Sequence, residues 1–146
     1  ESGGWKENLL MNQDGDFFSR ILMIASKAYF ISNAKVYYRI GEYSTVSKAN
    51  SENKLVSLLD SYISYKENAL IHKDNLRVRK ALSYNFTYFI YLYGNKYPAL
   101  YKKAKDQVEN LGVGFQLRKK SPRIRFVSKI LGFENLMAIR RIISKE

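Results

Sequence analysis

The chain has 146 residues, 46% of them hydrophobic and 14% aromatic, which is enough for one modest core and too little for two ordinary domains. It contains no cysteine, which excludes disulfides, thiolate metal sites and thiol catalysis and suits a reducing cytoplasm. Twenty-five Lys and Arg against 13 Asp and Glu give a net charge of +12, which calls for a polyanionic neighbour such as lipid headgroups, nucleic acid or phosphorylated substrates.

The N-terminal residues indicate a loop that leads into a helix. The Gly-Gly-Trp segment at residues 3–5 has no helical or strand period, and residues 12–16 form a polar turn. From Phe17 onward, apolar side chains recur at helical spacing with polar residues between them. This pattern predicts a helix over residues 14–28.

The next segment is the only convincing strand region of the chain. Residues 29–31 and 36–38 are rich in the aromatic and β-branched side chains that suit strands, with a Ser-Asn break between them. A connection with Gly, Ser and Thr follows over residues 41–50. We therefore expect a strand or hairpin here.

Everything after residue 50 has helical periodicity. Apolar residues recur at i, i+3, i+4, i+7 and i+8 from Leu55 onward, and we expect further helices over residues 75–93 and 99–111. Gly112 ends the last of these, and Pro98 lies where a first helical turn tolerates proline. Residues 118–146 form a basic amphipathic tail, which Gly132 should divide into two short helices.

Four segments of the first third resemble the acceptor side of family 2, GT-A-type inverting glycosyltransferases. Residues 3–9 (Gly-Gly-Trp-Lys-Glu-Asn-Leu) resemble a Gly-Gly-aromatic-x-Glu element, and residues 12–20 (Asn-Gln-Asp-Gly-Asp-Phe-Phe-Ser-Arg) resemble an acidic pair that opens a helix. Residues 35–39 (Lys-Val-Tyr-Tyr-Arg) and 44–47 (Ser-Thr-Val-Ser) are similar to the tyrosine-arginine element and the Ser/Thr loop of that family.

The resemblance implies a reaction in which an acceptor hydroxyl attacks the anomeric carbon of a nucleotide sugar while a nucleoside diphosphate leaves from the other face. A carboxylate must take the proton of that hydroxyl. By its position in the motif, Asp14 is the general base and Asp16 a supporting group. Gln13 stands where many family members have an acid. Aspartate is also a favoured N-cap residue, so a purely structural role for Asp14 stays open.

The same resemblance assigns substrate contacts to Gly3, Gly4, Trp5 and Arg39. Trp5 would stack on an acceptor sugar, or equally would plug a core, and Arg39 would bind a phosphate, or pair with a loop carboxylate. The divalent metal ion of the family, Mg²⁺ or Mn²⁺, would have its ligands outside this chain. Asp14 and Asp16 follow a polar turn, whereas the metal-binding Asp-x-Asp element ends a buried strand.

The expected fold is therefore mainly α: a remnant of a GT-A α/β domain over residues 1–49, a helical region over 50–117 and the basic tail over 118–146. We expect the C-terminal portion of a longer glycosyltransferase, inactive alone, that acts with inversion on a saccharide or lipid-linked acceptor in cell-surface polysaccharide synthesis. No run approaches the roughly 18 apolar residues of a membrane span. The tail would instead hold a cytoplasmic enzyme at the inner face of the cell membrane, or would form a pair of helices that pack on the body with their charges solvated.

Two other readings stay open. The chain could be a free-standing basic helical module for an anionic partner, either nucleic acid or a membrane surface, with charge as its whole mechanism. Nothing in the sequence matches a nucleic-acid motif, so we do not expect nucleic acid. The chain could also be a packing or dimerisation domain that forms a homodimer through its aromatic helix at residues 75–93.

Overall fold

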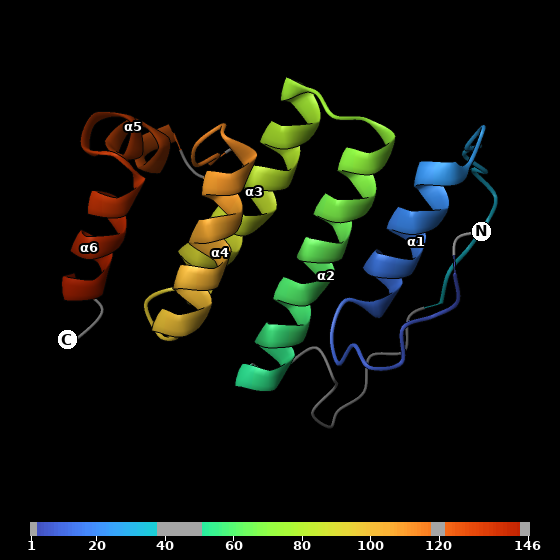
Figure 1. The fold of residues 1–146 in the computed structure, drawn as a ribbon, viewed down its shortest axis with the longest axis horizontal. Coiled ribbons are helices and arrows are strands. Elements are labelled where there is room, and N and C mark those ends of the chain that lie inside the picture. The colour runs from blue at the N-terminus through green and yellow to red at the C-terminus, as the bar shows by residue number, and fades with distance from the viewer. Residues whose placement is uncertain (1–2, 38–50, 118–121, 144–146) are drawn as a thin grey trace. The chain divides into compact units, whose positions relative to one another are not determined.

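The computed structural model describes residues 3–37, 51–117 and 122–143 (Figure 1). Within these ranges the chain is mainly helical and contains no strand, which confirms the expected mainly α class. The helices are α1 Gln13–Ile24, α2 Glu52–His72, α3 Leu76–Tyr93, α4 Pro98–Leu111, α5 Pro122–Leu131 and α6 Phe133–Ile143. The chain divides into two compact units, Glu1–Asn68 and Ala69–Glu146, with their border inside α2. The domain borders drawn from the sequence stay predictions.

In the first unit, α1 begins one residue earlier and ends four residues earlier than the sequence indicates. Asn12 precedes it in the left-handed conformation, with φ of 63°, and Ala25 leaves it with an extended backbone. The last three residues of α1, Leu22 to Ile24, are all exposed. Helices in proteins gain most of their stability from packing, so α1 has little to extend it beyond Ile24.

The strand expected at residues 29–31 and 36–38 is not formed in the described part, and residue 38 lies outside it. The large side chains there are exposed, and those of Phe30 and Tyr37 are at least 90% exposed. A strand needs a neighbouring strand for its backbone N–H and C=O groups, and the described residues provide none. The segment is therefore a loop, in spite of its composition.

In the second unit, α3 and α4 form an antiparallel helical hairpin (Figure 1). The side chain of Asn75 accepts a hydrogen bond from the backbone N–H of Val78 and so caps α3, and Pro98 opens α4. Gly112 ends α4 with φ of 66°, a conformation that favours glycine. These bounds confirm the helices expected at residues 75–93 and 99–111. The buried apolar residues of the two helices include Phe86, Phe89, Ile90, Ala104 and Val108.

The tail forms two helices, α5 and α6, divided at Gly132 as expected. Gly132 has φ of 81°, which any other residue would adopt only with strain. None of the helices in the described ranges combines the length and the apolar character that a membrane span requires.

Candidate functional site

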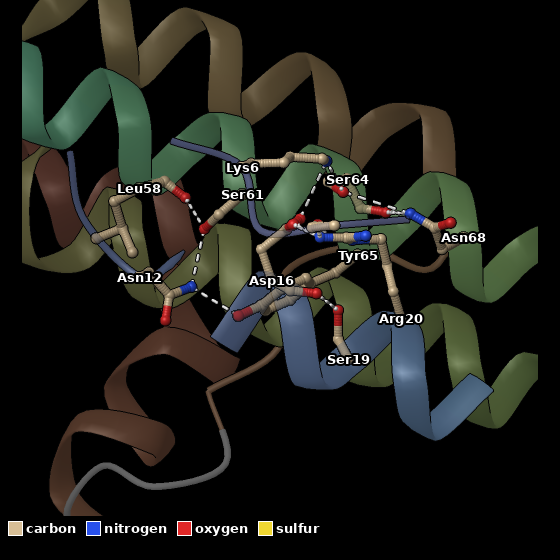
Figure 2. Close-up of polar contacts among 11 residues, drawn as sticks. Lys6, Asn12, Asp16, Ser19, Arg20, Leu58, Ser61, Ser64, Tyr65 and Asn68 are labelled. Atoms are coloured by element: carbon tan, nitrogen blue, oxygen red, sulfur yellow. Dashed lines mark hydrogen bonds and ion pairs between the residues drawn. The ribbon is translucent and has the colours of Figure 1, made fainter. Parts of the chain in front are cut away.

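The first unit is built around a stripe of polar side chains on one face of α2. We call Ser57, Ser61, Ser64, Tyr65 and Asn68 the polar stripe, because their spacing places them on the same side of the helix. The three serines are buried although they are polar. Buried hydroxyls need hydrogen-bond partners, and the N-terminal loop and α1 supply them (Figure 2).

The loop before α1 is held by the first half of this stripe. Ser57 Oγ accepts hydrogen bonds from the backbone N–H groups of Leu10, at 2.7 Å, and Met11, at 3.3 Å. The side-chain amide of Asn12 donates to Ser61 Oγ at 2.8 Å and to the hydroxyl of Tyr65 at 2.6 Å (Figure 2). These hydrogen bonds fix Asn12, the left-handed residue that precedes α1, and thereby the direction in which the helix starts.

The packing around Tyr65 shifts the pKa of its phenol. Its burial raises the pKa of the phenol, the charges of Asp16 and Asp14 raise it further, and the hydrogen bond from Asn12 opposes them. The net effect is a raised pKa. The phenol therefore stays neutral at pH 7 and accepts the bond from Asn12.

Asp16 is the centre of the buried network. Its side chain is 0% exposed. Lys6 Nζ lies 3.2 Å from Oδ1 and donates to Ser64 Oγ at 2.8 Å, and Arg20 Nε donates to Oδ2 at 3.1 Å (Figure 2). The guanidinium of Arg20 also donates to the backbone carbonyl of Gly4 at 2.8 Å. Asp16 thus joins the N-terminal loop, α1 and α2 through two cations.

The electrostatics of Asp16 favour its ionised form. Burial alone would raise the pKa of this carboxyl, but hydrogen bonds from Ser64, Lys6 and Arg20, together with the charge of Lys6, outweigh that effect. The pKa of Asp16 consequently lies below its ordinary value. A carboxylate with these partners is an anchor, because its oxygens are already occupied inside the unit.

Asp14 has the opposite environment. It lies in the first turn of α1 and is exposed to solvent, two residues before the buried Asp16. Asn12, and not Asp14, is the residue at the N-cap position, so the N-cap role that stayed open for Asp14 is excluded. An exposed carboxylate at this position can reach a hydroxyl of a bound molecule and accept its proton.

The predicted substrate-contact residues at the N-terminus come together beside α1. The ring of Trp5 lies 5.0 Å from that of Phe17, its Nε1 donates to Gln13 Oε1 at 3.4 Å, and it keeps 47% of its surface exposed. Trp5 is therefore not the core plug of the alternative reading. Gly3 has φ of 67°, and a Cβ there would lie 3.0 Å from Arg20. The remaining predicted contact, Arg39, lies outside the described residues.

Sequence reasoning missed the partners that fix this arrangement. From the sequence, no role is assigned to Lys6, Arg20 or the serines of α2. A signal did exist: Ser57, Ser61 and Ser64 recur at helical spacing within about 60° of one another, and small polar residues in register can accept a packed loop. The periodicity alone does not tell whether such a face meets water or chain.

Substitution of Gly15 tests whether the close approach of α1 to α2 contributes to the stability of the fold. A Cβ at Gly15 would overlap the hydroxyl of Tyr65 and the side-chain amide of Asn12. Although alanine favours a helix interior by about 1 kcal/mol over glycine, we expect Gly15→Ala to lower the free energy of unfolding. Urea denaturation measures this change. Gly4→Ala is the matched control, because a Cβ there meets nothing within 4 Å. Equal midpoints for both variants would contradict the described packing.

The described residues contain no group of three or more His, Asp or Glu side chains that could hold a metal ion. The divalent ion implied by the resemblance therefore stays a prediction about other residues. Comparison of the chain with protein-family models, with curated proteins and with solved structures finds no match.

Proposed function

We propose that the chain is the acceptor-side, C-terminal portion of a family 2, GT-A-type inverting glycosyltransferase, with Asp14 as its general base. One observation carries the proposal: two acids in one helical turn have opposite environments. Asp16 is fully buried and bound to two cations, whereas Asp14, two residues earlier, is exposed. This is the division that the resemblance implies, with one catalytic carboxylate and one that supports it.

In the proposed reaction Asp14 takes the proton of an acceptor hydroxyl as its oxygen bonds to the anomeric carbon. The bond from that carbon to the nucleoside diphosphate breaks on the opposite face, and its electron pair leaves with the diphosphate. A hydroxyl is a poor nucleophile at neutral pH, so the base must lie within hydrogen-bond reach of it. The bonds from the polar stripe to the loop support this role, because they hold the start of α1 in one direction.

Trp5 is the proposed platform for the acceptor sugar. An indole face complements the C–H face of a pyranose, and Phe17 braces the ring from within the unit. Gly3 and Gly4 keep this turn close to Arg20, which also binds Asp16. The Trp5 platform and Asp14 are therefore both positioned relative to Asp16. Arg39 is proposed to bind a phosphate of the donor or of a lipid-linked acceptor.

The exposed segment at residues 29–37 supports the wider assignment to a GT-A α/β domain. Its aromatic and β-branched side chains have strand propensity but no strand partner among the described residues. Such a segment suits addition to a larger sheet, which the proposal places elsewhere in the intact protein. The nucleotide-sugar site and the ligands of a divalent ion would lie there too, and that ion would neutralise the leaving diphosphate.

The proposal is tested by turnover of the intact protein that contains this chain. We expect one of a panel of nucleoside-diphosphate sugars to release its nucleoside diphosphate when a saccharide or lipid-linked acceptor is added. Chelation of divalent ions should abolish the release, and Mg²⁺ or Mn²⁺ should restore it. Proton NMR of the product should show the anomeric configuration opposite to that of the donor. A product that retains the configuration would refute the inverting assignment.

A further inference from the structure

The two last helices expose an apolar surface that their own packing does not need. On α5 the exposed side chains include Phe126 and Ile130, and on α6 they include Ile139, Ile142 and Ile143. We call these five side chains the apolar surface. Ile142 and Ile143 are 73% and 67% exposed. Isolated exposed apolar residues are common, but several large ones on two successive helices indicate contact with something else.

The opposite face of α6 is firmly packed, so the exposed isoleucines are not the result of a loose helix. Phe133, Leu136 and Met137 are buried. The ring of Phe133 stacks on Phe115 with 4.4 Å between centroids, and the guanidinium of Arg140 lies 3.8 Å from the centroid of the Tyr91 ring. These contacts fix which face of α6 points away from the rest of the second unit.

Two further polar contacts hold the same face of α6. Lys105 of α4 lies 2.6 Å from a carboxylate oxygen of Glu134, and Arg140 donates a hydrogen bond to the backbone carbonyl of Tyr91. Burial of the isoleucines against the second unit would require these contacts and the packed core to be given up. The apolar surface is therefore a stable feature that is available to a partner.

The net charge of the tail selects the chemistry of the partner. Residues 118–146 contain nine of the chain's 25 Lys and Arg residues but only two of its 13 acids. Lys129 and Arg141 are exposed on the same two helices. A second copy of the chain would bring two strongly cationic surfaces together. Nucleic acid would neutralise the charges but would not bury the isoleucines, whereas an anionic lipid surface does both.

We propose that α5 and α6 bind the surface of an anionic membrane, with the apolar surface entering the headgroup layer and the basic side chains meeting lipid phosphates. α5 has 10 residues and so is about 15 Å long, half of the roughly 30 Å hydrocarbon core, which places it in the plane of the interface. The inference does not depend on Asp14 or on sugar transfer. A lipid-bound enzyme would, however, meet a lipid-linked acceptor at the same surface.

The test is sedimentation of the intact protein with large unilamellar vesicles, without any nucleotide sugar. Vesicles of phosphatidylcholine with about 30% phosphatidylglycerol should bind it, vesicles of phosphatidylcholine alone should not, and added salt should weaken binding. The double variant Ile142→Ser, Ile143→Ser should reduce the vesicle affinity by about tenfold or more. Ile71→Ser is the matched control, because Ile71 is 81% exposed on α2 and should leave binding unchanged.

Three results would overturn the proposal: equal binding to both kinds of vesicle, no binding to either, or the same loss for the Ile71 control as for the double variant. If the protein instead elutes as a dimer in gel filtration that the double variant converts to a monomer, and vesicles do not bind, the surface joins two copies. Because no sugar donor is present, none of these results bears on the transferase proposal.

Discussion

Replacing Asp14 with asparagine in the intact protein is expected to lower the rate of sugar transfer by about 10²–10⁴-fold, the usual contribution of a general base. Asparagine keeps the size of the side chain but cannot take a proton from the acceptor hydroxyl. Because Asp14 is exposed and lies outside the buried network of Asp16, the variant should unfold at the same urea concentration as the wild type. Rates from single-turnover assays, with donor binding measured separately, make the comparison.

Asp106→Asn is the matched control for this experiment. Asp106 is an exposed acid on α4, in the second unit, and should leave both transfer and stability unchanged. Full turnover by the Asp14 variant would remove it from the mechanism. If the Asp14 variant lost both donor binding and turnover, Asp14 would act on the donor. That result would also contradict a base on the acceptor side.

The second large effect is expected at Asp16, and it concerns folding. Asp16→Asn leaves Arg20, which is buried, and Lys6 without the carboxylate that lies about 3 Å from each of them. Breaking a buried ion pair by removing one partner costs about 3–5 kcal/mol in the free energy of unfolding. Urea denaturation of the variant should show this loss. A change below about 1 kcal/mol would be typical of a surface pair and would contradict the anchor role.

The pH dependence of stability provides a second measurement on the same variant. The folded-state pKa of Asp16 is lowered, so its contribution is fully present above the ordinary aspartate pKa and is lost as pH falls through the folded value. The wild type should therefore lose stability on acidification from about pH 5 to pH 2 more steeply than Asp16→Asn does. Parallel curves for the two proteins would show that Asp16 does not titrate with folding.

The sequence predicts well those elements whose ends carry local signals. α3 and α4 begin and end where Asn75, Pro98 and Gly112 indicate, because a capping side chain, a fixed φ and a left-handed glycine act within a few residues of the chain. The division of the tail at Gly132 has the same origin. Nothing beyond the neighbouring residues is needed to place these boundaries.

Features that depend on distant residues could not be predicted in this way. Strand propensity at residues 29–31 does not produce a strand without a partner to accept its hydrogen bonds. The hydrogen bonds between the N-terminal loop and the buried serines of α2 join residues that lie 46 to 58 positions apart in the sequence. The motif ranked Asp14 above Asp16, but only Lys6, Arg20 and Ser64, brought together by the fold, distinguish the buried acid from the exposed one.

The most direct measurement is an experimental structure of the intact protein with a nucleotide-sugar analogue and an acceptor bound. The proposal predicts a carboxylate oxygen of Asp14 about 2.6–3.2 Å from the acceptor hydroxyl that faces the anomeric carbon, with Asp16 still bound to Lys6 and Arg20. An acceptor hydroxyl that meets a different base, with Asp14 pointing into solvent, would contradict it.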